Sequence, residues 1–152
     1  MKQRISALGL DVGRRRIGVA GCDGTGLIAT GLFTIERQSF QQVVEQLQAI
    51  ARERQVQVLV VGLPYCMDGH LGQQARQVQK FVHRITPLLN LPVVYVDERL
   101  TSVQAEELIE AERRVSHDKG LIDRKAAALI LQRWLDEGAQ RPDLMESDRV
   151  TP

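Results

Sequence analysis

Three acidic residues lie at the predicted ends of secondary-structure elements. Asp11 ends a buried strand, Glu98 follows another strand directly, and Asp123 lies near the start of the last predicted helix. A buried carboxylate without a partner is costly, and three that converge need a compensating cation. Mg²⁺ or Mn²⁺ would be the natural one, because both ions prefer carboxylate oxygens. Two such ions could activate water and stabilise the leaving oxygen of a phosphodiester.

Each of these acids also has a purely structural interpretation. Asp11 could be a turn residue before Val12, and Asp123 in a first helical turn could complement the helix dipole. Asp97 and Glu98 could be a solvated strand end. The coincidence of three acids at one sheet edge favours a metal site. Alternation along a strand puts Asp97 and Glu98 on opposite faces, and the residue pattern leaves open which one faces the site.

Positive charge is concentrated locally and is not spread over the chain. The 20 Lys and Arg residues against 19 Asp and Glu residues give a net charge of +1. Phosphate binding must therefore come from local clusters, and Arg14, Arg15 and Arg16 lie just after Asp11. These arginines could bind a nucleic-acid backbone, although an exposed charged turn is the commoner explanation of such a run.

Apolar patterning predicts the elements that position these residues. Strands are expected at residues 4–11, 16–22, 27–35, 56–62 and 92–96. Helices are expected at residues 40–51, 75–85, 101–114 and 121–135. Ser39 and Gln42 form a capping box for the first of these helices, and Pro87 should stop the second. In the last helix the apolar stripe of Ala127, Ile130 and Trp134 should pack on the sheet, with Asp123 at its start.

This order of elements predicts an α/β fold. A short connection between the first two strands predicts an antiparallel hairpin, and the later β-α-β crossovers predict parallel strands. The result is a mixed five-stranded sheet, its first three strands antiparallel, flanked by helices on both faces. We expect one domain over residues 1–138 and a loose C-terminal tail over residues 139–152.

Composition excludes several classes of protein. No apolar run reaches the roughly 18 residues that a membrane span needs. Cys22 and Cys66 have neither metal-ligand nor disulfide-framework spacing, so we expect reduced thiols in a cytoplasmic protein. Aromatic residues make up only 4% of the chain, which argues against binding single strands mainly by base stacking.

Four motifs in order resemble the YqgF/RuvX family over residues 4–136. They are LGLDVG (8–13) with IGVA (17–20), VVGLP (60–64) with MDG (67–69), DERLTS (97–102), and Lys119 with ID (122–123) and AAALIL (126–131). Each motif alone is weak evidence for the family. Four motifs in the same order along nearly the whole chain are strong evidence for it. One departure is Cys66, where the family pattern often has a polar residue such as Asn.

The resemblance implies a ribonuclease H-like fold and a metal-dependent nuclease. It places Asp11, Glu98 and Asp123 on the family's acidic catalytic positions, which favours Glu98 over Asp97. The carboxylates themselves predict Mg²⁺ or Mn²⁺ as cofactor, and the resemblance implies processing of the 5′ end of pre-16S ribosomal RNA. We assign Lys119, with the three arginines, to nucleic-acid binding.

Other functions stay open at this point. A Holliday junction resolvase would keep the site, act on four-way DNA and normally be a dimer. A non-catalytic RNA-binding ribosome-assembly factor would need no metal. A nucleotide-binding module of the actin and sugar-kinase kind fits the hairpin after Asp11, although such proteins need two domains. The partner is thus structured RNA or branched DNA, without a membrane, and the chain is a monomer or a homodimer.

Overall fold

The computed structural model of the chain describes residues 5–64, 71–97 and 119–139. Five strands and three helices lie within these ranges. In chain order they are β1 (Ala7–Val12), β2 (Arg16–Cys22), β3 (Ala29–Glu36), α1 (Phe40–Glu53), β4 (Val58–Leu63), α2 (Gln73–Leu89), β5 (Val93–Asp97) and α4 (Lys119–Asp136). The helix predicted at residues 101–114 and the tail after Ala139 lie outside the described residues.

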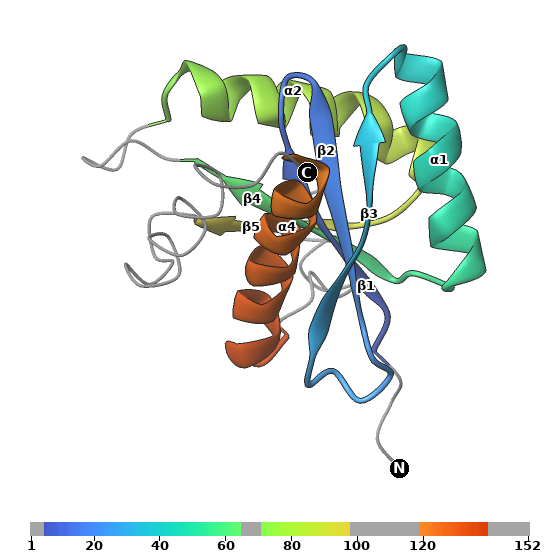
Figure 1. Ribbon diagram of the computed structural model, residues 1–152, viewed down its shortest axis with the longest axis vertical. Helices are drawn as coiled ribbons and strands as arrows, with labels where there is room; N and C mark the ends of the chain where they lie inside the picture. Colours follow the sequence, from blue (N-terminus) through green and yellow to red (C-terminus); the bar gives the residue numbers. More distant parts are fainter. Residues whose placement is uncertain (1–4, 65–70, 98–118, 140–152) are drawn as a thin grey trace, which may run out of the picture.

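The strands form one mixed sheet in the order β3-β2-β1-β4-β5 (Figure 1). The pairs β1–β2 and β2–β3 are antiparallel, and β4 is parallel to both β1 and β5. Every residue of β4 is buried, as expected for a β-branched strand covered on both faces. The predicted five-stranded topology is confirmed.

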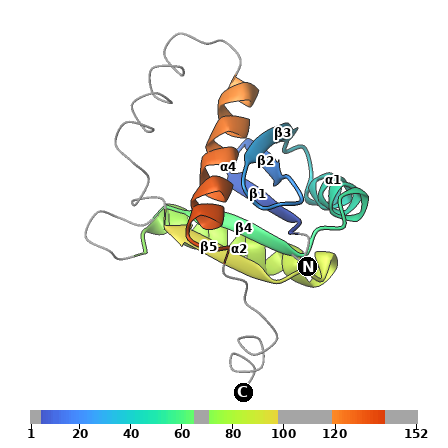
Figure 2. The same ribbon diagram turned by 90° about the horizontal axis from the view of Figure 1, so that it is seen from below.

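Helices cover both faces of this sheet (Figure 2). One apolar cluster joins α1 and α2 to residues such as Leu8, Leu10 and Ile17. The other joins α4 to Ala7, Ala20 and their neighbours on the opposite face. Because side chains alternate along a strand, each core-facing residue can be assigned to one of the two faces.

The predicted start of α1 is confirmed in detail. The backbone N–H of Gln42 donates to the Ser39 hydroxyl, and the Gln42 side chain accepts from the Ser39 backbone, which completes the capping box. This cap fixes where the chain leaves β3 and turns into the helix. The end of β3 and the start of α1 are therefore held together beside the β1–β2 hairpin.

The helix boundaries differ from the sequence prediction by up to four residues, and two of these differences have a clear physical reason. Helix α2 runs through Pro87 and ends at Leu89, where Asn90 adopts a left-handed conformation. The proline removes only one N–H close to the end of the helix, and the Asn90 N–H still donates to the Thr86 carbonyl. Helix α4 begins at Lys119, so this residue opens the helix and does not lie in a preceding loop.

Helix α4 lies very close to the sheet. A Cβ atom added to Gly18 on β2 would lie 1.9 Å from the Asp123 carbonyl oxygen, and one added to Gly9 on β1 would lie 2.7 Å from the Leu131 Cβ. On the helix side, the expected stripe is buried: Ala127, Ile130 and Trp134 are at most 6% exposed. Glycines on the strands therefore determine how closely the helix packs on the sheet.

Replacing Gly18 with alanine should displace the first turns of α4. The added methyl group meets backbone atoms of Asp123, which cannot rotate away as a side chain could. We expect Gly18→Ala to cost about 2–3 kcal/mol and to lower Tm by roughly 5–10 °C. Thr30→Ala, at an exposed position of β3, is the control and should stay within about 0.5 kcal/mol of wild type. Equal Tm values for the two variants in thermal melts would contradict the close approach.

Candidate active site

Asp11 is the next-to-last residue of β1 and is only partly buried. Its side chain lies on the α4 face, because Gly9, two residues earlier, faces Leu131 of α4. Leu10 and Val12 point the other way, into the α1–α2 core. The apolar strand therefore ends by presenting one carboxylate beside the helix.

Asp123 lies in the second turn of α4, because the helix begins at Lys119. The helix dipole acts mainly within the first turn, so it gives a weaker reason for an acid at this position. The side chain of Asp123 is 16% exposed. Its backbone carbonyl lies against the Cα of Gly18, which fixes the residue over β2.

Asp11 and Asp123 are brought to the same end and the same face of the sheet. Asp11 is the register partner of Gly18 on the neighbouring strand, and Gly18 is the residue that Asp123 covers. Directly paired residues of antiparallel strands have Cα atoms about 4.5–5.5 Å apart. Two carboxylates, from positions 112 residues apart in the chain, therefore flank one glycine.

Glu98, the third predicted acid, lies outside the described residues. Within the described ranges, no group of three or more His, Cys, Asp or Glu side chains could hold a metal ion. The strand before Glu98 is informative. Val94 and Val96 pack in the α4 cluster and Tyr95 packs in the opposite one, so strand alternation puts Asp97 on the face away from Asp11.

Asp123 is held by an ion pair that the sequence did not predict. The Arg16 Nε donates to the Asp123 Oδ2 at 2.6 Å, and the two side chains are 25% and 16% exposed. This hydrogen bond raises the pKa of Arg16, and the nearby charge of Glu36 also acts to raise it. The contact orients one carboxylate oxygen and shows that this environment attracts a cation.

The three predicted arginines therefore have different surroundings. Arg14 and Arg15 are exposed at the tip of the β1–β2 hairpin, whereas Arg16 is turned inward to Asp123. The hairpin is closed by the Gly13 N–H, which donates to the Arg16 carbonyl at 2.9 Å. Lys119 is exposed at the first residue of α4.

Arg37 also holds this hairpin, and the sequence reasoning missed it. Its backbone N–H donates to the Arg15 carbonyl at 2.8 Å, and its Nη1 donates to the Gly13 carbonyl at 2.6 Å. The only local signal was a cation just after a strand. Its partners lie more than twenty residues earlier, on an element that only folding brings near.

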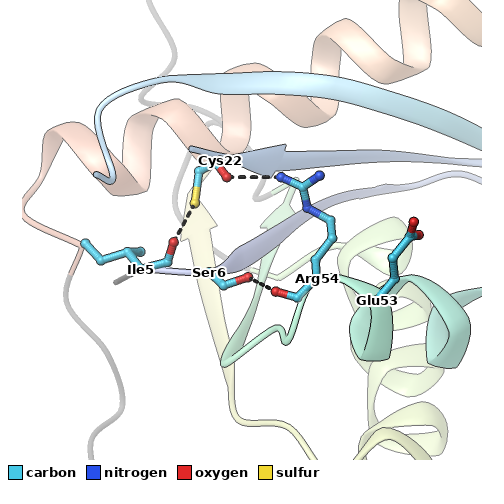
Figure 3. Close-up of a pocket in the computed structure, with 5 residues that line it drawn as sticks. All are labelled: Ile5, Ser6, Cys22, Glu53 and Arg54. Carbon is cyan, nitrogen blue, oxygen red and sulfur yellow. Dashed lines mark hydrogen bonds between the residues drawn. The ribbon is translucent and has the colours of Figure 1, made fainter. Parts of the chain in front are cut away.

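A pocket of about 290 Å³ lies at the end of β2 away from Arg16 (Figure 3). Its polar contacts are internal: the Ser6 hydroxyl donates to the Arg54 carbonyl, and the Arg54 guanidinium donates to the Cys22 carbonyl. The Cys22 thiol donates to the Ile5 carbonyl, and burial raises the pKa of this thiol. The thiol is thus kept protonated, and these contacts tie α1 to the sheet.

The sheet order and its helical layers match a known class of fold. The structure of Thermus thermophilus RuvC in complex with a Holliday junction substrate aligns with a TM-score of 0.58 and 13% identity, covering 90% of this chain and 98% of that chain. The fold is ribonuclease H-like, as predicted. A family model described as "RuvX: Holliday junction resolvase" matches residues 5–137. The chain belongs to the RuvX family.

Close relatives match nearly the whole chain. A protein of Trichormus variabilis is 70% identical over 137 residues, which is 90% of this chain and 91% of the relative. One of Crocosphaera subtropica is 64% identical over 136 residues, 89% and 95% of the two chains. Both carry the name "Putative pre-16S rRNA nuclease". Within the described ranges, no helix is long and apolar enough to cross a membrane.

The Arg16–Asp123 ion pair leads to a test of stability in the absence of metal. Asp123→Asn keeps the shape of the side chain but leaves Arg16 with a neutral partner. With chelator present, we expect a loss of about 1 kcal/mol, or roughly 3 °C in Tm, and a smaller loss at high salt. The control is Asp136→Asn, the same change at an exposed position of α4, which should leave Tm nearly unchanged. If Asp123→Asn melts at the wild-type temperature, the ion pair contributes no stability.

Proposed function

We propose that this chain is a metal-dependent endonuclease that hydrolyses phosphodiesters and processes the 5′ end of pre-16S ribosomal RNA. The observation that carries the chemistry is the placement of Asp11 and Asp123 around Gly18 at one end of the sheet. The names of relatives up to 70% identical support the substrate. Action on ribosomal RNA precursors supports a cytoplasmic location.

Asp11, Glu98 and Asp123 are the residues that would hold Mg²⁺ or Mn²⁺. The donor set fits a hard cation, because carboxylate oxygens are the preferred ligands of both ions. Arg16 bonds to the Oδ2 of Asp123, and a carboxylate that accepts such a hydrogen bond can still serve as a ligand through its other oxygen. When bound, the metal supplies an activated water and stabilises the leaving oxygen of the phosphodiester.

The residues of this chain bind and orient the substrate. Arg14 and Arg15 on the hairpin, and Lys119 at the start of α4, are exposed cations at the same end of the sheet as Asp11. Phosphate contacts of this kind position a nucleic acid without reading its sequence. Arg16 keeps the Asp123 carboxylate turned toward β2 while the substrate binds.

Resolution of Holliday junctions is the second candidate function. The description of the family model favours it, and it uses the same carboxylates on branched DNA. Symmetric cleavage of a junction would require two copies of the chain related by a twofold axis. Incubating the protein with a four-way DNA junction beside an RNA leader separates the two candidates.

Cleavage should require the metal and all three acids. We expect Asp11→Asn, Glu98→Gln and Asp123→Asn each to abolish cleavage of a labelled pre-16S leader in Mn²⁺, because an amide cannot supply the negative charge that holds a hard cation. The losses should not add in double variants, because the acids act as one unit. Chelator should abolish the activity of the wild-type protein.

Asp97→Asn is the matched control for Glu98→Gln. Strand alternation puts Asp97 on the face away from Asp11, so this variant should keep most of the activity. If Asp97→Asn is inactive and Glu98→Gln is active, the assignment of the third ligand is wrong. If Asp11→Asn cleaves at the wild-type rate, the metal site itself is wrong, and a non-catalytic RNA-binding assembly factor becomes the leading function.

The hairpin cations should contribute to substrate binding through charge. Replacing both Arg14 and Arg15 with alanine should weaken binding of the RNA leader and flatten the dependence of log Kd on log salt concentration, by roughly 0.7–0.9 for each phosphate that is no longer neutralised. Fluorescence anisotropy in chelator measures this without cleavage. An unchanged affinity and salt slope would mean that these arginines are exposed to solvent at the turn and do not contact the RNA.

A further inference from the structure

On the α1–α2 face of the β1–β2 hairpin, two arginines lie against aromatic rings. The Arg37 guanidinium carbon lies 4.6 Å from the centroid of the Phe81 ring, and that of Arg84 lies 3.9 Å from the Phe40 centroid. Among the described residues, no carboxylate lies within 4.0 Å of the charged nitrogens of Arg37, Arg84 or Arg14. Within this part of the chain, the face therefore carries positive charge that no ion pair compensates.

Arg37 is the most constrained of these cations. Its hydrogen bond to the Gly13 carbonyl and its stacking on Phe81 fix the guanidinium plane. Burial lowers the pKa of Arg37, and the charge of Arg84 lowers it further, although a guanidinium stays protonated in proteins. Among the described residues, its side chain donates a hydrogen bond to the Gly13 carbonyl only, which uses one of its five N–H donors. An anion beside Arg37 would relieve the cost of holding this charge in place.

A pocket of about 50 Å³ lies beside Arg37. The described residues that line it are Val12, Gly13, Arg14, Arg37, Gln74, Gln77 and Val78. A single water needs only about 10–15 Å³, so this space holds a group of several atoms. The polar side chains among these residues are guanidinium and amide donors, which suits a small anion.

The N-terminus of α2 adds to the attraction for an anion. Gln74 and Gln77 belong to the first turns of this helix, whose N-cap, Gly72, provides no side-chain hydrogen bond. The positive end of the helix dipole therefore lies at the pocket without an internal acceptor from its cap. The arginines, the amides and the helix end favour the same kind of ligand.

The pocket lies next to the candidate active site, on the other face of the same hairpin. Val12 lines the pocket and follows Asp11 directly, and strand alternation sends their side chains to opposite faces. We propose that Arg37, Arg14, Gln74 and Gln77 bind a backbone phosphate of the nucleic acid, next to the phosphate that lies at Asp11. This proposal rests on the proposed nuclease function. The pocket anchors the strand where it crosses the hairpin.

The test is binding of a fluorescein-labelled RNA stem with single-stranded ends, measured by anisotropy in chelator at several KCl concentrations. Arg37→Gln should weaken binding about five- to tenfold and reduce the salt slope by roughly 0.7–0.9, the value for one neutralised phosphate. Arg52→Gln, the same change at an exposed position late in α1, is the matched control and should bind like wild type.

A second variant keeps the test decisive if Arg37→Gln fails to fold. Gln77→Glu puts a carboxylate into the pocket at an exposed position, where it would pair with an arginine and repel phosphate. It should weaken RNA binding as Arg37→Gln does, whereas Gln46→Glu on the exposed face of α1 should not. If Gln77→Glu and Gln46→Glu bind RNA equally well, the proposal is overturned.

Free inorganic phosphate is the alternative ligand of this pocket, because it carries the same charged oxygens as a backbone phosphate. Inorganic phosphate added to the wild-type protein should shift the side-chain NMR signal of Arg37 and compete with the RNA. If phosphate shifts this signal while Arg37→Gln still binds RNA like wild type, the pocket takes a free anion and the backbone assignment is wrong. Because binding is measured without metal, the two failures are distinguishable: a wild-type protein that binds but does not cleave RNA would overturn the nuclease proposal, whereas equal binding by the pocket variants and their controls would overturn the phosphate site.

Discussion

The close approach of α4 to the sheet is the constraint on which the rest of the site depends. Glycines face the helix on three neighbouring strands, at Gly9, Gly18 and Gly31, and a methyl group at any of them would meet atoms of α4 at 2.9 Å or less. Ala127 on the helix completes the contact. This packing places Asp123 of α4 over Gly18 of β2, and Gly18 is the register partner of Asp11. No side chain of β2 therefore stands between the two acids at this position.

The β1–β2 hairpin then separates two electrostatic environments. On the α4 face lie carboxylates, with Arg16 bonded to Asp123; on the α1–α2 face lie Arg37 and its aromatic supports. The net charge of +1 gives no sign of this arrangement, because it sums all charges without regard to where they lie in the fold. The proposed metal site and the proposed phosphate site thus lie on opposite sides of one short turn, an arrangement by which a small domain would bind a polyanion without a basic surface throughout.

Much of the fold follows from local patterns in the chain. The Ser39–Gln42 capping box, the alternation along the strands and the stripe on α4 each involve residues a few positions apart, so their signals survive in the sequence. Helix ends were harder to predict. Pro87 lies inside α2, because one missing hydrogen bond near the end of a helix is outweighed by the packing of the rest. The start of α4 at Lys119 was missed because the apolar period becomes visible only from Leu121 onward.

The sequence by itself determined the sheet topology and the family, because ordered motifs and short-range periodicity carry that information. Only the tertiary structure decided which groups meet. Arg16 looked like one of three equivalent arginines, yet it bonds to an aspartate 107 residues away. Arg37 carried no motif, and its pocket is assembled from the hairpin and α2. Such contacts depend on how closely helices and strands pack, and a periodic pattern fixes which face of an element is buried but not what it will touch.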